Sequence, residues 1–178
     1  MTAAANQWVI GSEGVGPIRL GGAVPQALLT ADLDQHYVAR YIADGQPFEG
    51  YRFEDPPLTV AIAGGPFARF SEKEAVDKVD PSRFRAAAGK QTRAGAKVQM
   101  IIVHGAGPAT AAGIGVGSDL AALRTAYPDI KLHSVPETFG NDEAVARSPT
   151  LKNVHFVFRS RKAAEAGDKI LRIDLWRD

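Results

Sequence analysis

The close spacing of short apolar segments most constrains what this chain can fold into. Its apolar runs are only long enough for strands, and many of the 18 glycines and 11 prolines stand between them. Short links of this kind suit antiparallel hairpins, because parallel strands need a crossover of about a dozen residues or more. The sequence therefore predicts an α+β protein made mainly of antiparallel sheet, with short helices.

The strongest predicted strand is 98–103, which reads Val-Gln-Met-Ile-Ile-Val, and the strongest helix runs from Ser118 to Tyr127. Ser118 is the expected N-cap, Leu120, Leu123 and Tyr127 share one face, and a proline ends the helix. The other predicted strands are 8–10, 14–22, 36–42, 51–54, 58–62, 130–135, 154–158 and 170–176, and one or two helical turns are expected in 24–29.

Residues 70–95 have a different pattern from the strands around them. Ser71 and Glu74 have the spacing of a capping box, and Asp80-Pro81 is typical of a second helix start. Large apolar residues are few in this stretch, so it predicts a short helical insertion that faces solvent.

A weak internal repeat relates residues 18–24 to residues 114–120. Both stretches contain an apolar-x-apolar-Gly pattern, in which the glycine suits a turn that needs positive φ. The simplest interpretation is two similar halves, 1–104 and 105–178, in one compact unit. The alternative is that both stretches are ordinary turn-then-helix patterns.

Charge and cysteine content exclude several classes of function. Lys and Arg total 21 against 20 Asp and Glu, so the net charge is +1, and we expect no nucleic-acid partner because such domains usually have a pI above about 9. The absence of cysteine excludes disulfides, zinc–thiolate sites, iron–sulfur ligation and a cysteine nucleophile. No apolar run approaches the ~18 residues that a membrane-spanning helix requires.

Two glycine motifs resemble catalytic or cofactor-binding signatures. Gly105-Ala106-Gly107 follows a strand, as in a dinucleotide-binding turn, but three glycines in 111–117 would weaken the helix that must bind the pyrophosphate. We interpret it as a linker, with nucleotide binding as the alternative. Gly117-Ser118 lacks the glycine spacing of a nucleophile elbow, which favours a helix cap.

The histidines provide a second alternative. His104, His133 and His155 lie in or beside predicted strands and can meet across a sheet, so one of them can serve as the base of a small hydrolase-like enzyme with a cleft between the halves. Ordinary sheet histidines explain the same pattern. We therefore assign no catalytic, cofactor-binding or metal-binding residue and expect no cofactor.

The candidate interaction surface is a basic cluster without an intervening acid. It consists of Arg83, Arg85, Lys90, Arg93 and Lys97. Such a cluster attracts phosphate, anionic lipid headgroups or an acidic partner. A solvated face is the alternative interpretation.

Four short motifs together resemble a family of bacterial envelope lipoproteins, whose enterobacterial members are regulated by the envelope-stress sigma factor RpoE. They are 12–16, 113–118, 126–127 and 169–177, and the stretch 70–95 departs from the family. The resemblance implies a periplasm-facing protein of the cell envelope, with a signal peptide and a lipid-bearing cysteine expected ahead of Thr2. These 178 residues contain no such cysteine.

We therefore expect a non-catalytic binding or assembly module of the cell envelope, with an envelope protein or an anionic surface as its partner. A cytoplasmic location is expected instead if the chain is not a trimmed mature form.

Overall fold

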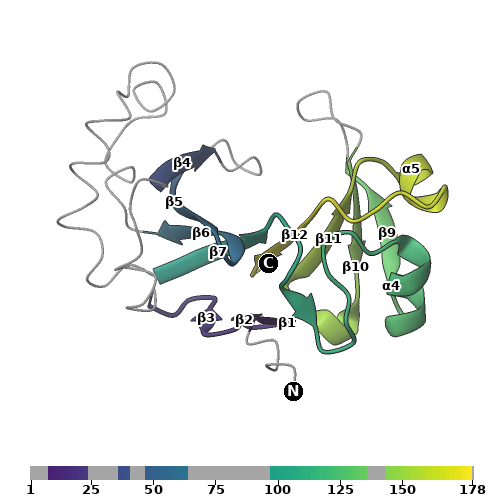
Figure 1. The fold of residues 1–178 in the computed structure, drawn as a ribbon, viewed down its shortest axis with the longest axis horizontal. Helices are drawn as coiled ribbons and strands as arrows, with labels where there is room; N and C mark the ends of the chain where they lie inside the picture. Colours follow the sequence, from purple (N-terminus) through teal and green to yellow (C-terminus); the bar gives the residue numbers. More distant parts are fainter. Residues whose placement is uncertain (1–7, 24–35, 41–46, 64–96, 136–142, 178) are drawn as a thin grey trace.

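A computed structural model describes residues 8–23, 36–40, 47–63, 97–135 and 143–177, and its strands form two sheets (Figure 1). The larger sheet contains β4 (His36–Arg40), β5 (Pro47–Glu54), β6 (Pro57–Ala63), β7 (Lys97–Val103), β9 (Lys131–Ser134), β10 (Ala144–Arg147), β11 (Val154–Phe158) and β12 (Arg172–Trp176). The smaller sheet contains β1 (Val9–Gly11), β2 (Gly14–Val15), β3 (Ile18–Arg19) and β8 (Ala109–Thr110). Two short α-helices, α4 (Leu120–Ala126) and α5 (Arg161–Glu165), and the 3₁₀ turn η3 (Pro149–Leu151) complete the described elements.

The larger sheet is entirely antiparallel and has eight strands in the order β4-β5-β6-β7-β12-β11-β10-β9. The smaller sheet has the order β3-β2-β1-β8, with one parallel pair between β1 and β8. This arrangement confirms the predicted α+β fold dominated by antiparallel sheet.

Several element bounds differ from the sequence predictions. The predicted strand 14–22 is two short strands, β2 and β3, which a turn at Gly16-Pro17 separates. β5 begins at Pro47, earlier than predicted, because its first residues pair with β4. The prediction missed them because Pro47 and Gly50 are poor strand formers. β10 and α5 were not predicted, since both are short and rich in alanine. The helical turns expected in 24–29, the insertion 70–95 and residues 41–42 lie outside the described residues.

The strand order of the larger sheet is symmetric about its central pair, β7 and β12. Each central strand is the last of a four-stranded meander, β4 to β7 or β9 to β12. Val103 pairs with Ile173 and Ile101 pairs with Leu175, so exchanging the halves turns one pair into the other. The two meanders therefore have the same topology. The boundary predicted after residue 104 falls one residue beyond the end of β7.

Hydrogen bonding repeats at the two stretches in which the sequence repeat was found. The Gly21 N–H donates to the Val98 carbonyl, and the Gly117 N–H donates to the Ile170 carbonyl. Each acceptor residue also returns a hydrogen bond: the Val98 N–H donates to the Gly22 carbonyl, and the Ile170 N–H donates to the Ser118 carbonyl. Both glycines have positive φ, 74° and 92°, as the repeat predicts. The sequence repeat therefore marks equivalent turns in the two halves.

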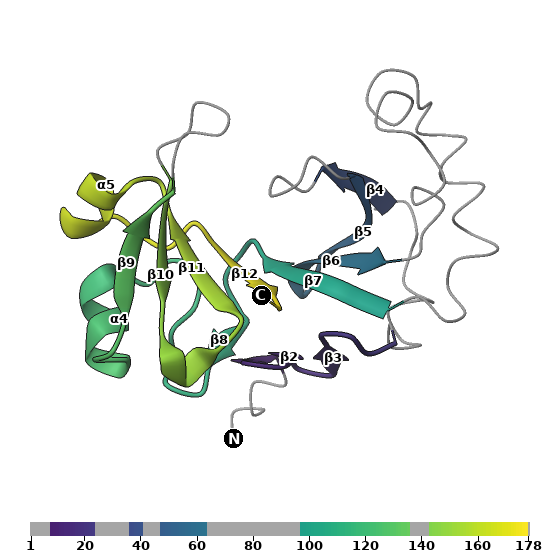
Figure 2. The ribbon, with the colours of Figure 1, turned by 180° about the vertical axis from the view of Figure 1, so that it is seen from behind.

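One face of the larger sheet is the main core face. Figures 1 and 2 show the small sheet beside β6 and β7, and α4 beside β9 and β10. Leu120, Leu123 and Tyr127 are all buried on the inner face of α4, which confirms the predicted apolar stripe. The Tyr127 ring lies 6.4 Å from the ring of Phe156 on β11.

The N-cap of α4 is Asp119, and the prediction of Ser118 was wrong by one residue. The Asp119 side chain accepts a hydrogen bond from the N–H of Ala122 at 2.8 Å. The Ser118 side chain instead accepts from the N–H of Gly115 at 3.2 Å. The carbonyl of Ser118 accepts a hydrogen bond from the N–H of Ile170, ahead of β12, and Asp119 has an extended conformation, so the helix begins only at Leu120.

We predict that Leu123→Ala lowers the free energy of unfolding by about 2–5 kcal/mol, because Leu123 is fully buried and its removal leaves a cavity. Urea unfolding followed by circular dichroism measures the change. Leu171→Ala is the control, because Leu171 is 47% exposed and its loss should change stability by less than about 0.5 kcal/mol. Equal effects of the two substitutions would contradict the assigned helix face.

Candidate functional site

A pocket of about 330 Å³ lies at one end of β9, β10 and β11. Its lining includes Lys131, His133, Arg147, Lys152 and His155, and the connection between β10 and β11 supplies the other lining residues. None of the described residues that line it carries a carboxylate. We call it the basic pocket, since it gathers three permanent cations and two imidazoles.

The strand register explains how cations distant in sequence come together. Lys131 is directly opposite Arg147, which is in turn directly opposite His155, so the three form one row across three strands. Residues in such a row are about 5 Å apart on the same face of a sheet. Like charges directly opposite each other destabilise a sheet. The row therefore concentrates positive charge at this end of the sheet.

One wall of the basic pocket is anchored through Asp129, which follows α4. The carboxylate of Asp129 accepts a hydrogen bond from the Ser148 hydroxyl at 2.6 Å and from the Thr150 hydroxyl at 2.8 Å. The hydrogen bond from Ser148, followed by that from Thr150, lowers the pKa of Asp129 below its usual value. These bonds hold the β10–β11 connection over the end of the sheet. They also use the Ser148 proton, which a nucleophile would have to give to a base.

His155 is held in a fixed orientation. It is buried, and its ring stacks on Trp176 with centroids 3.7 Å apart and an interplanar angle of 12°. Its Nδ1 lies 3.2 Å from the carbonyl oxygen of Asp174. Because a carbonyl can only accept, Nδ1 carries the proton in this contact. The ring is therefore a rigid part of the pocket wall.

The structure brings together two of the three histidines considered as catalytic bases. His133 and His155 both line the basic pocket, but β10 lies between the strands that carry them. His133 is opposite Val145 and His155 is opposite Arg147, so the two histidines are also two residues apart along the strands. Their Cα atoms are therefore roughly 12 Å apart. His104 follows β7 and does not line this pocket. The pocket belongs to the C-terminal half rather than to a cleft between halves.

A partly buried ion-pair network joins Arg172 and Asp174 on β12 to Glu143, next to His155. Arg172 donates two hydrogen bonds to Glu143, at 2.6 and 2.8 Å, and its Nε lies 3.0 Å from Asp174. Two carboxylates thus share one guanidinium, so its charge cannot fully compensate both. Burial raises the pKa of Asp174 to about 6, against the opposing attraction of Arg172. Asp174 is therefore the member of this network that titrates near neutral pH.

The glycines at 105 and 107 have a packing explanation. The chain after Gly107 forms the strand β8, and the next helix begins only at Leu120, so the turn offers no helix N-terminus to a pyrophosphate. A Cβ on Gly105 would lie 2.9 Å from Pro57, which explains why a residue without a side chain stands there. The described geometry favours the interpretation of this stretch as a linker.

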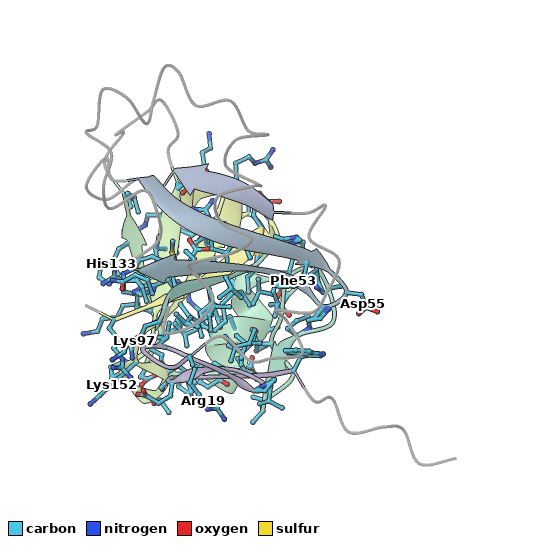
Figure 3. The ribbon with its side chains drawn as sticks, turned by 90° about the vertical axis from the view of Figure 1, so that its left-hand side faces the viewer. Arg19, Phe53, Asp55, Lys97, His133 and Lys152 are labelled. Atoms are coloured by element: carbon cyan, nitrogen blue, oxygen red, sulfur yellow. The ribbon has the colours of Figure 1, made fainter. Side chains whose placement is uncertain are left out.

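Only one residue of the predicted basic cluster lies within the described residues. Arg83, Arg85, Lys90 and Arg93 lie outside them, whereas Lys97 is the exposed first residue of β7. Figure 3 shows the Lys97 side chain on the same side of the molecule as those of His133 and Lys152, with Asp55 on the opposite side.

Sequence reasoning did not identify Lys131, Arg147 or Lys152. Their spacing along the chain carries no motif, and only strand register makes them neighbours. Within the described part of the chain, no group of three or more His, Asp or Glu residues is placed to hold a metal ion.

We predict that Asp174→Asn changes how stability depends on pH. The folded pKa of Asp174, about 6, lies above the ordinary aspartate value of 3.8 expected in the unfolded chain, so its contribution to stability is complete below about pH 4 and is lost as pH rises through 6. The free energy of unfolding of the wild type should fall by up to about 3 kcal/mol between these pH values because of Asp174, and this fall should be absent in Asp174→Asn. Urea unfolding at pH 4, 5, 6 and 7 gives the difference between the two proteins. A difference that does not change with pH would contradict the raised pKa.

Comparisons with known proteins complete the description of the site. No protein-family model matches the chain, and no curated protein or solved structure shows significant similarity to it. Among the helices of the described residues, none is long and apolar enough to cross a membrane.

Proposed function

We propose that this protein is a non-catalytic binding module of the cell envelope, and that it holds an anionic group of its ligand in the basic pocket. The observation that supports binding is the row formed by Lys131, Arg147 and His155, with Lys152 nearby and no carboxylate among the described lining residues. Such a row concentrates positive charge, which attracts an anion.

The chemistry of the lining favours a phosphate or carboxylate group with an apolar part attached. The guanidinium of Arg147 can bind two oxygens of such a group at once, and Lys131 and Lys152 add compact charges. Pro149 and Leu151 supply an apolar wall beside these cations. A small anion would therefore occupy the charged row, and an apolar group next to it would contact the wall.

Two observations favour binding over catalysis. Ser148, the hydroxyl of the pocket, donates its proton to Asp129, whereas a serine nucleophile donates to a histidine. His133 and His155 are too far apart in the sheet to act on one another directly. The pocket therefore contains charge for holding a ligand without an evident relay for proton transfer.

The assignment to the cell envelope rests on the resemblance carried by residues 12–16, 113–118, 126–127 and 169–177. An envelope protein or an anionic surface is the expected partner. Fractionation of cells that express the native gene tests the location. Recovery with the envelope or periplasm is expected, and recovery with the cytoplasm would refute this part of the proposal.

We predict that Arg147→Gln weakens the binding of inorganic phosphate at least tenfold, because it removes the guanidinium at the centre of the row. Isothermal titration calorimetry at low salt gives the affinity. Arg159→Gln is the matched control, because Arg159 is exposed, pairs with Asp168 and does not line the pocket. It removes the same charge and should leave binding within about twofold of wild type.

Three outcomes would overturn this proposal. Wild type that does not bind phosphate refutes the site, and equal losses in the two arginine variants show that only net charge matters. If the protein hydrolyses p-nitrophenyl acetate or p-nitrophenyl phosphate, and His133→Gln abolishes that activity, the hydrolase-like enzyme is favoured instead.

A further inference from the structure

We infer that the anionic part of the ligand is a linear chain of phosphate groups, which lies along one end of the larger sheet from the basic pocket to Lys97. The inference rests on the proposed function, since the basic pocket is one end of this surface. We call the surface the basic end, and it consists of Lys97, Lys131, Arg147, Lys152 and Arg177.

Strand register places these residues at the same end of the sheet. β7 begins at Lys97 and is antiparallel to β12, so the last residues of β12 lie at that end, with Trp176 opposite Met100. The start of β11 lies there too, since Val154 is opposite Leu175. β10 ends and β9 begins beside it, where Arg147 and Lys131 pair.

The cations are spaced at intervals that suit a repeating anion. Lys97 and Arg147 are separated by three strand spacings across the sheet and, since the row of Arg147 meets β7 at Ile102, by five residues along it, which together is roughly 20 Å. Lys152 lies between them along this end, in the connection that precedes β11. Lys97, Arg147 and Lys152 are all exposed, and Figure 3 shows Lys97 and Lys152 on the same side of the molecule. One small anion cannot contact cations this far apart, whereas a chain of phosphates can.

Arg177 is also available to a chain ligand. It follows β12, and its Nη2 lies 3.0 Å from Glu13, with both side chains more than half exposed. Exposed pairs of this kind are worth about 1 kcal/mol or less, so a phosphate can compete with Glu13 for the guanidinium.

The described surface favours a phosphate chain over a nucleic acid or a membrane. Nucleic acids without sequence preference bind on aromatic rings, but the large exposed apolar residues described are Val9, Val135 and Leu171, none of them aromatic. Surfaces that bind membranes combine cations with exposed apolar side chains. Val135 and Leu171 adjoin the last residue of β9 and the first of β12, at the opposite end of the sheet.

The test compares inorganic phosphate with a linear polyphosphate of long chain, in titrations at two salt concentrations. Polyphosphate should bind at least tenfold more tightly than phosphate, with a steeper loss of affinity in salt. Lys97→Gln should weaken polyphosphate binding severalfold and leave phosphate binding unchanged, because Lys97 lies outside the pocket. Arg147→Gln should weaken both.

Lys169→Gln is the matched control for Lys97→Gln. The two lysines occupy equivalent places in the two halves, Lys97 opposite Ala23 and Lys169 opposite Asp119, at opposite ends of the sheet. The control removes the same charge and should leave both affinities unchanged.

The outcomes separate this inference from the proposed function. Failure of wild type to bind phosphate refutes the pocket itself. If phosphate binding depends on Arg147 but polyphosphate binds no more tightly than phosphate, the pocket stands and the inference of a phosphate chain is wrong. The same holds if Lys97→Gln does not change the affinity for polyphosphate. Tighter binding of a single-stranded oligonucleotide or of anionic lipid vesicles than of polyphosphate also overturns it, in favour of bases or a lipid surface.

Discussion

The antiparallel pairing of β7 with β12 is the contact on which the rest of the structure depends. It joins two four-stranded meanders into one sheet, and it covers a strand edge of each half that would otherwise expose unpaired backbone groups. Ile101, Val103, Ile173 and Leu175 on these two strands are fully buried in one core. Both halves are therefore packed around a common seam, and the position of every other strand follows from it.

The same symmetry shows where the two halves differ in chemistry. Exchange of the halves about the central pair brings Ile102 to the place of Asp174 and Met100 to the place of Arg172. The N-terminal half thus has apolar side chains where the C-terminal half has a partly buried ion pair, which Glu143 extends. The basic pocket adjoins this polar patch through His155. A shared scaffold therefore carries its candidate binding chemistry in the C-terminal half.

Local sequence signals identified those elements whose stability is decided locally. The strand 154–158, the apolar stripe of α4 and the two positive-φ glycines were predictable, because a short apolar run, helical period and backbone freedom are properties of neighbouring residues. β10 was missed because Ala144 and Ala146 pack well only in a fully paired central position. The N-cap was misplaced because Ser118 bonds Ile170, which is 52 residues away along the chain, and neighbouring residues do not reveal such a contact.

The sequence by itself determined the fold class, most strand positions and the two equivalent glycine turns, since each depends on patterns within short windows. Only the tertiary structure decided that Lys131, Arg147 and Lys152 form one pocket with His155, and that Lys97 lies at the same end of the sheet. The physical reason is strand register, which depends on how the cores of both halves pack together. A shift of one residue would turn each of these side chains to the other face.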